Sequence, residues 1–256
     1  MDFAHFIFLV VVGAIGGLIS AVVGGASLVT YPALIATGIH PLAAVVCANV
    51  SLVPSNLVAA LADRTQLPRF DRAFVVMVFA TVASAGAGAM LLLATPARLF
   101  EVVVPLLLGL ATVLFAFSER IAGWMLNRAA QRGRTVTFSI TGLKFLVPVS
   151  VYGGYFGSGL GILLLGVLSI ATGGNYRVAN VTKNLVGGLN SLAAALVYIA
   201  QDAVQWPPAL ALAAGGIAGG LIGAYVARVM PRALIRLLVV GFGALLTLML
   251  AIRYWF

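Results

Sequence analysis

Charged residues are scarce in this chain. They account for 8% of the 256 residues, whereas a soluble domain carries about 25%. The hydrophobic share is 62% and the mean hydropathy is +1.15. A helix that spans a membrane needs about 20 largely apolar residues, and the chain contains several uncharged stretches of this length. The sequence therefore predicts an all-α integral membrane protein.

Cysteine and histidine are also rare. The single cysteine, Cys47, excludes an intrachain disulfide and a cysteine-rich metal cluster. The run Gly157-Ser158-Gly159 lacks the surrounding βαβ unit of a nucleotide-binding loop. Ser158 has no histidine or aspartate at comparable depth to activate it as a nucleophile. We therefore predict no cofactor, metal or catalytic centre, and an intramembrane enzyme is the least favoured alternative.

Acidic residues are few and none is deep in an apolar segment. All six lie in or near loops and segment ends, which argues against a carboxylate proton relay. The net charge of +9 comes from basic residues in short loops, without an extended basic face. This pattern is typical of membrane-orientation signals and not of nucleic-acid binding.

The chain repeats itself at a constant shift of 135 residues. The tetrapeptides Ile35–Gly38 and Ile170–Gly173 are identical, and further matched pairs share the same shift: Gly24/Gly159, Asn49/Asn184, Gln66/Gln201 and Pro96/Pro231. Internal repeats of this size are typical of transporters, whose substrate site commonly lies between the halves. We divide the chain into repeat 1 (1–118), a basic cytoplasmic linker (119–137) and repeat 2 (138–256), which together form one transporter domain.

Each repeat is predicted to contain one long apolar segment followed by three transmembrane helices. The long segments are Phe3–Thr37 and Phe138–Thr172. As continuous helices they would be about 52 Å long, against a hydrocarbon core of about 30 Å. Glycine clusters interrupt both, at Gly24-Gly25 in the first and from Gly153-Gly154 to Gly161 in the second. Each is therefore predicted to be a glycine-broken hairpin, either re-entrant or with two short crossings.

Both forms of the hairpin leave an odd number of crossings per repeat, so the two repeats have inverted topology. With the linker in the cytoplasm, inverted repeats place 13 of the 15 basic residues on the cytoplasmic side. Parallel repeats place only 9 there. The positive-inside rule favours the inverted arrangement, with both termini outside a bacterial-type cytoplasmic (inner) membrane.

The hairpin turns are candidate binding elements. A broken helix exposes backbone N–H groups and helix ends that can face an anion in a protein-lined cavity. The first turn would supply Gly24, Gly25 and Ser27, and the second Gly157, Ser158 and Gly159. The alternative is that these glycines serve only close helix packing.

Polar residues near the membrane midplane would complete the site. Asn49 and Asn184 are matched and lie eight or nine residues into the helices that follow the hairpins, roughly 12–14 Å deep. Lys183 lies beside Asn184, and a lysine at this depth needs a cavity or a partner. Three further residues are added to the predicted lining: Asn56, Asn180 and Thr182. The alternatives are a lysine that snorkels to the interface and polar residues that only link helices.

Glycine-rich motifs occur in a definite order in each half of the chain. They comprise Gly16-Gly17, Ser20, Gly24-Gly25, Pro32, Gly38-Ile39-His40-Pro41 and Ala43-Ala44 in the first half, and Gly154, Gly157, Gly159, Gly161, Thr172-Gly173 and Ala179 in the second. With these motifs the chain resembles the TauE/SafE sulfite exporter family over nearly its full length. The resemblance implies a membrane permease for sulfite, sulfoacetate or related sulfur-containing anions.

The sequence thus predicts a permease for small anions, with the bilayer and a small anionic substrate as its partners. An anion that leaves a cell with a negative interior gains about 2.3 kcal/mol per charge per 100 mV, so export would need no coupling ion. The alternative from another class is a non-transporting membrane partner or assembly protein. The identity of the anion, the coupling ion and a homo-oligomeric state are left open.

Overall fold

The computed structural model describes residues 2–22, 24–117, 140–172, 175–226 and 232–255, with single positions between 120 and 127. In this part of the chain every regular element is helical. The first half contains α1 (Phe3–Val22), α2 (Ser27–Ala36), α3 (Pro41–Ala62), the short 3-10 helix η1 (Arg64–Gln66), α4 (Arg72–Ala94) and α5 (Ala97–Ala116). The second half contains α7 (Ile140–Tyr155), α8 (Leu160–Ala171), α9 (Tyr176–Ala200), α10 (Trp206–Val226) and α11 (Arg232–Trp255). The predicted all-α fold is confirmed.

Several helices are long and apolar enough to cross a membrane. Within the described residues these are Phe3–Val22, Pro41–Ala62, Arg72–Ala94, Ala97–Leu114 and Trp206–Val226. Large apolar side chains such as Phe79, Leu106 and Leu221 are exposed on their outer faces, where a lipid bilayer would cover them. The protein is a multi-pass membrane protein.

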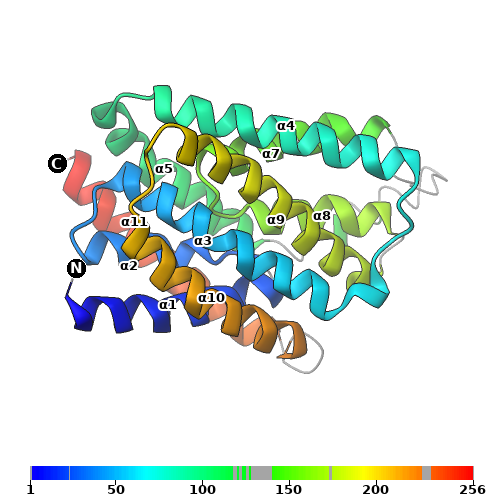
Figure 1. The fold of residues 1–256 in the computed structure, drawn as a ribbon, viewed down its shortest axis with the longest axis horizontal. Helices are drawn as coiled ribbons and strands as arrows, with labels where there is room; N and C mark the ends of the chain where they lie inside the picture. The colour runs from blue at the N-terminus through cyan, green and yellow to red at the C-terminus, as the bar shows by residue number, and fades with distance from the viewer. Residues whose placement is uncertain are drawn as a thin grey trace.

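The helices follow the predicted repeat. Helices α1 to α5 have counterparts α7 to α11 in the same order, and α3 and α9 begin at the matched positions Pro41 and Tyr176. Figure 1 shows that α1 packs along α10 and that α4 packs along α7. The first helix of each half therefore packs against the other half, so the two halves form one helix bundle.

Helices α3 and α9 run side by side in opposite directions (Figure 1). Asn49 of α3 contacts Tyr198 in the last turns of α9, whereas Asp63, which follows α3, binds Arg177 at the start of α9. Inverted repeats are expected to have antiparallel matching helices, and the inverted topology of the two repeats stays a prediction. The placement of each end relative to the cytoplasm stays a prediction, and most of the linker 119–137 lies outside the described residues.

Both long apolar segments are hairpins. In the first, here called hairpin 1, α1 ends at Val22 and α2 begins at Ser27; in hairpin 2, α7 ends at Tyr155 and α8 begins at Leu160. Of the glycine cluster predicted to interrupt the second segment, Gly157 and Gly159 lie in the turn between α7 and α8, whereas Gly153 and Gly154 lie inside α7. Gly154 instead lets α7 approach α4, since a Cβ there would collide with the backbone of Ala85.

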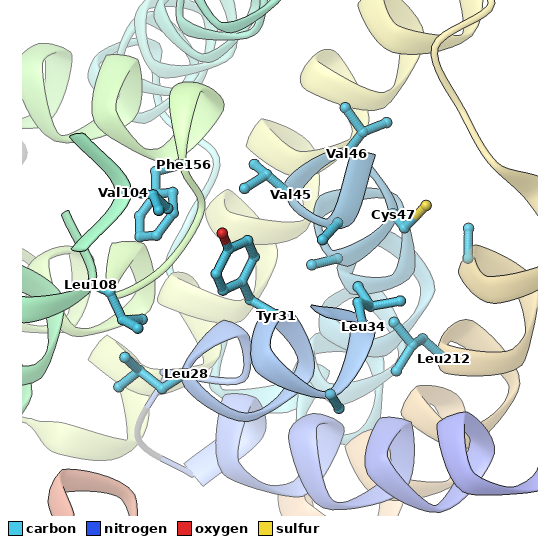
Figure 2. Close-up of a cluster of buried hydrophobic side chains, with 14 of the residues drawn as sticks. Leu28, Tyr31, Leu34, Val45, Val46, Cys47, Val104, Leu108, Phe156 and Leu212 are labelled. Atoms are coloured by element: carbon cyan, nitrogen blue, oxygen red, sulfur yellow. The ribbon is translucent and has the colours of Figure 1, made fainter. Parts of the chain in front are cut away.

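A buried apolar cluster joins the hairpins to α3 and α5. Figure 2 shows Tyr31 of α2 pointing between Phe156 of hairpin 2 and Val45 of α3. The rings of Tyr31 and Phe156 meet edge to face, with their centroids 5.8 Å apart, a favoured aromatic geometry. The core therefore lies where the two hairpins approach each other.

Candidate substrate site

The turns of the two hairpins touch. A Cβ added to Gly24 would lie 2.6 Å from the Cα of Gly161, and one added to Gly161 would lie 2.7 Å from the Cα of Gly24. Gly24 also has a φ of +83°, which side chains disfavour. Backbone therefore packs on backbone at this point, and α2 and α8 both begin beside it.

Hairpin 2 is held by α3 and α9. The side chain of Asn49 lies directly against Gly157, where a Cβ would come within 2.9 Å of the Asn49 Cγ. The Asn49 amide donates to the Tyr198 hydroxyl over 3.5 Å, and this hydroxyl donates to the carbonyl of Gly154 over 2.6 Å. These buried bonds connect both central helices to the end of α7.

Hairpin 1 is held by one face of α9. The Lys183 Nζ donates to the carbonyl of Ser20 over 2.6 Å, and the Asn180 amide donates to the carbonyl of Ala21 over 2.9 Å. The Tyr176 hydroxyl donates to the next carbonyl, that of Val22. The last carbonyls of a helix lack partners within the helix and carry partial negative charge. Three side chains of α9 thus cap three successive carbonyls of α1.

Lys183 is deeply buried, with 2% of its surface exposed, and is the one charged side chain among the described residues that is buried. Its ammonium group is directed to the end of α1, so its geometry differs from that of a lysine that snorkels to the interface. One of its three N–H donors is used by Ser20. The ammonium retains donors for a further group.

The other predicted site residues are buried, but only some of their side chains have hydrogen-bond partners. Asn56 accepts a hydrogen bond from the Ser20 hydroxyl over 2.7 Å, and the Thr182 hydroxyl donates to Val178 of its own helix. Ser158 Oγ and Asn184 Oδ1 have no hydrogen-bond partner in the described structure. Buried polar atoms without a partner call for an explanation, and a bound ligand would supply one.

The remaining predicted residues are parts of the turns themselves. Gly25 and Ser27 are buried at the start of α2, and Gly159 lies just before α8 with a φ of +80°. The first N–H groups of a helix have no partner within it and attract negative charge. The structure therefore brings the predicted turn residues of both repeats to one place, although no direct bond joins Asn49 to Asn184.

Sequence reasoning assigned no role in the binding site to several residues that shape this region. Tyr198 holds hairpin 2, Tyr176 and Ser20 take part in capping α1, and Gly161 is the contact point of the turns. The helical spacing of Tyr176, Asn180 and Lys183 places them on one face, which was a readable signal. The role of Tyr198 was not readable, because its partner is a backbone carbonyl of another helix.

Broken helices whose turns meet, with buried polar groups beside them, are typical of membrane transporters. Comparison with known proteins supports this class. The family model described as Sulfite exporter TauE/SafE matches residues 9–250. The chain belongs to the TauE/SafE sulfite exporter family, a family of membrane transporters and not of enzymes.

Two curated relatives point to the same class. A protein of Haemophilus influenzae named "Probable membrane transporter protein" is 24% identical over 237 residues, which cover 92% of this chain and 90% of the relative. A Sinorhizobium protein named "Probable membrane transporter protein ORF9" is 26% identical over 209 residues, covering 81% and 77%. No solved structure matches the chain. The protein is a membrane transporter.

Proposed function

We propose that this transporter carries a small sulfur-containing anion, such as sulfite, sulfoacetate or another organosulfur compound, out of the cell across the cytoplasmic membrane. The observation that carries the proposal is the meeting of the two hairpin turns beside Lys183. A buried cation and two helix starts in one region favour a negatively charged ligand.

The proposed binding groups are mostly hydrogen-bond donors. The turns would offer backbone N–H groups and the Ser158 hydroxyl, and the central helices would offer amide and ammonium groups. The full set of proposed binding residues is Gly24, Gly25, Ser27, Gly157, Ser158, Gly159, Asn49, Asn56, Asn180, Thr182, Lys183 and Asn184. Sulfite and sulfonate groups carry three oxygens on one sulfur, so donors from two opposed turns can bind them together. Hydrogen bonds between a charged partner and such donors are stronger than neutral ones.

The membrane potential would drive export. The interior of a bacterial cell is negative, and each negative charge that leaves gains about 2.3 kcal/mol per 100 mV. With both termini outside, a reporter enzyme fused to the C-terminus should be active only in the extracytoplasmic compartment. Activity of this reporter in the cytoplasm would contradict the proposed orientation.

Flux measurements in proteoliposomes test the substrate. Purified protein would be reconstituted and an inside-positive potassium diffusion potential imposed, with sulfite, thiosulfate, sulfoacetate or taurine outside. We expect uptake of at least one of the anions that rises with the imposed potential. Taurine, a zwitterion without net charge, should show no such dependence. Absence of flux for every compound would favour a non-transporting partner protein.

A further inference from the structure

We infer that Lys183 is a built-in cation that takes the place of a coupling sodium ion, so that transport proceeds without sodium. The inference rests on the proposed anion transport and specifies its energetics. In transporters with broken helices, the C-terminal ends of half-helices and unwound carbonyls coordinate the coupling cation. The end of α1 likewise presents helix-terminal carbonyls at the turn of hairpin 1, and the Lys183 ammonium group is bonded to one of them.

The contact has the features of a cation site. The Nζ of Lys183 lies 2.6 Å from the carbonyl oxygen of Ser20, within the last turn of α1. The carbonyl of Ala21 is next in line, and Asn180 binds it. The negative end of the α1 dipole stabilises a positive charge at this point. Because the ammonium is tethered to α9, it stays at the site throughout the transport cycle.

Capping alone does not require the charge of Lys183. The two carbonyls that follow Ser20 are capped by the neutral side chains of Asn180 and Tyr176. A charged side chain at this depth is costly, whereas a neutral amide is much less so. A neutral glutamine could cap the Ser20 carbonyl as well, so capping does not explain the positive charge of Lys183. The charge therefore has a separate role.

No carboxylate balances this charge in the described structure. Asp63 binds Arg177, Glu101 binds His40, and Asp71 caps α4, all of them at helix ends. The groups left to balance Lys183 are the end of α1 and a bound anion. A fixed cation does not travel with the anion, so each transport event would move only the charge of the anion.

Repeat 1 has no cation at the position that matches Lys183. The residue of α3 that matches Lys183 is Ala48, which is buried in the apolar core. In the described structure the end of α7 is held by the neutral hydroxyl of Tyr198. The transporter thus carries a single built-in cation and not one per repeat.

Sodium replacement tests the inference directly. Wild-type proteoliposomes should transport the anion at the same rate, within about twofold, when choline replaces all sodium. Lys183→Ala should lose about tenfold or more of the flux, and sodium or methylammonium ions should restore part of it by occupying the vacated site. Asn180→Ala is the matched control, because it removes a neutral cap from the next carbonyl and should not respond to cations. Wild-type flux that depends on sodium would overturn the inference.

A stability measurement gives a readout that does not need transport. In detergent, methylammonium chloride should raise the melting temperature of Lys183→Ala relative to choline chloride, as expected for a ligand of the native state, and should leave wild type and Asn180→Ala unchanged. If the wild-type protein transports no anion, the proposed function fails, but these melting-temperature measurements still test whether Lys183 occupies a cation site. A Lys183→Ala protein that matches wild type in melting temperature and ignores every cation would overturn it.

Lys183→Gln is a second variant that tests the inference even if Lys183→Ala does not fold. Glutamine can still donate to the Ser20 carbonyl, so this variant should fold but lose the charge. We expect its flux to fall by about tenfold or more. Transport at the wild-type rate by Lys183→Gln would show that the charge is not needed and would overturn the inference.

Discussion

Hairpin 1 and hairpin 2 arise from matching parts of the repeat, yet α9 holds them through different groups. At hairpin 1, Lys183, Asn180 and Tyr176 cap successive carbonyls of α1. At hairpin 2, the neutral Tyr198 binds a single carbonyl of α7. In the described structure a basic side chain of α9 binds the end of α1, whereas a neutral one binds the end of α7. The two repeats can therefore keep similar helix arrangements while only one side of the proposed binding region carries a positive charge.

The first helix of hairpin 1 and the first helix of hairpin 2 also end at different positions of the repeat. Helix α1 continues to Val22, whereas α7 stops at Tyr155, two residues earlier in the repeat. Gly157, which matches Val22, has a φ of +73°, a conformation that a β-branched residue strongly resists. The glycine therefore permits the earlier turn in hairpin 2, and the valine extends the helix in hairpin 1.

The contact between the turns should be the most sensitive point of this comparison. Gly161→Ala places a Cβ 2.7 Å from the Cα of Gly24, so the backbones must separate, at a cost of about 1–3 kcal/mol. We expect a clearly lower melting temperature and loss of transport. Gly166→Ala on the same helix is the control, because a Cβ there meets nothing within 4 Å. Equal behaviour of the two variants would contradict close contact of the turns.

The support of hairpin 2 should be the next most sensitive feature. Tyr198→Phe leaves the buried carbonyl of Gly154 without its partner, which costs about 1–3 kcal/mol in the interior of a protein. We expect a lower melting temperature and a raised KM for the transported anion. Tyr225→Phe is the control, since Tyr225 is 68% exposed. An unchanged KM in Tyr198→Phe would show that the support of hairpin 2 by Tyr198 does not contribute to substrate binding.

The hydrogen bond between hairpin 1 and α3 should have a smaller effect. Ser20→Ala removes the hydroxyl that donates to Asn56 but keeps the backbone carbonyl that Lys183 binds. Hydrogen bonds between membrane helices contribute about 0.6 kcal/mol on average. We expect a small fall in melting temperature, with the insensitivity of flux to sodium unchanged. Sodium-dependent flux in this variant would show that the Ser20 hydroxyl, and not only its carbonyl, sets the cation site.

The ion pair at the far end of α3 and α9 should matter least. Arg177 binds Asp63 through two hydrogen bonds of 3.1 and 3.0 Å, but the arginine side chain is half exposed. Exposed pairs contribute little and are weakened by salt. Arg177→Gln should therefore lower the melting temperature only slightly, and mainly at low ionic strength. An effect as large as that of Tyr198→Phe at high salt would reverse the order proposed here.

The helix frame could be predicted closely because it depends on local properties. Helices α3 and α9 follow the two hairpins as predicted, and they begin at the repeat-matched positions Pro41 and Tyr176. Within the predicted glycine cluster of hairpin 2, Gly157 and Gly159 form the turn, whereas Gly154 lies inside α7 and lets it pack closely on α4. The matched positions before α9 and α3 differ in their contacts: the Asn175 side chain caps α9, whereas the His40 side chain makes no cap hydrogen bond and pairs with Glu101.

The candidate site could be predicted only in its residue types. Asn49 and Lys183 were singled out because polar groups are rare in such an apolar chain. Their partners, Gly157 and the carbonyl of Ser20, are backbone groups that every sequence contains. No pattern of side chains marks which carbonyl or which glycine a distant helix will reach.

The sequence by itself determined the membrane environment, the helical class and the duplication, because composition, segment length and a constant spacing are properties of the chain alone. Only the tertiary structure decided that Gly24 meets Gly161, that Tyr198 supports hairpin 2 and that Lys183 lies on the end of α1. These contacts depend on how helices from opposite halves pack. Packing brings together groups far apart in the chain and leaves buried carbonyls to be satisfied by whichever donors lie near.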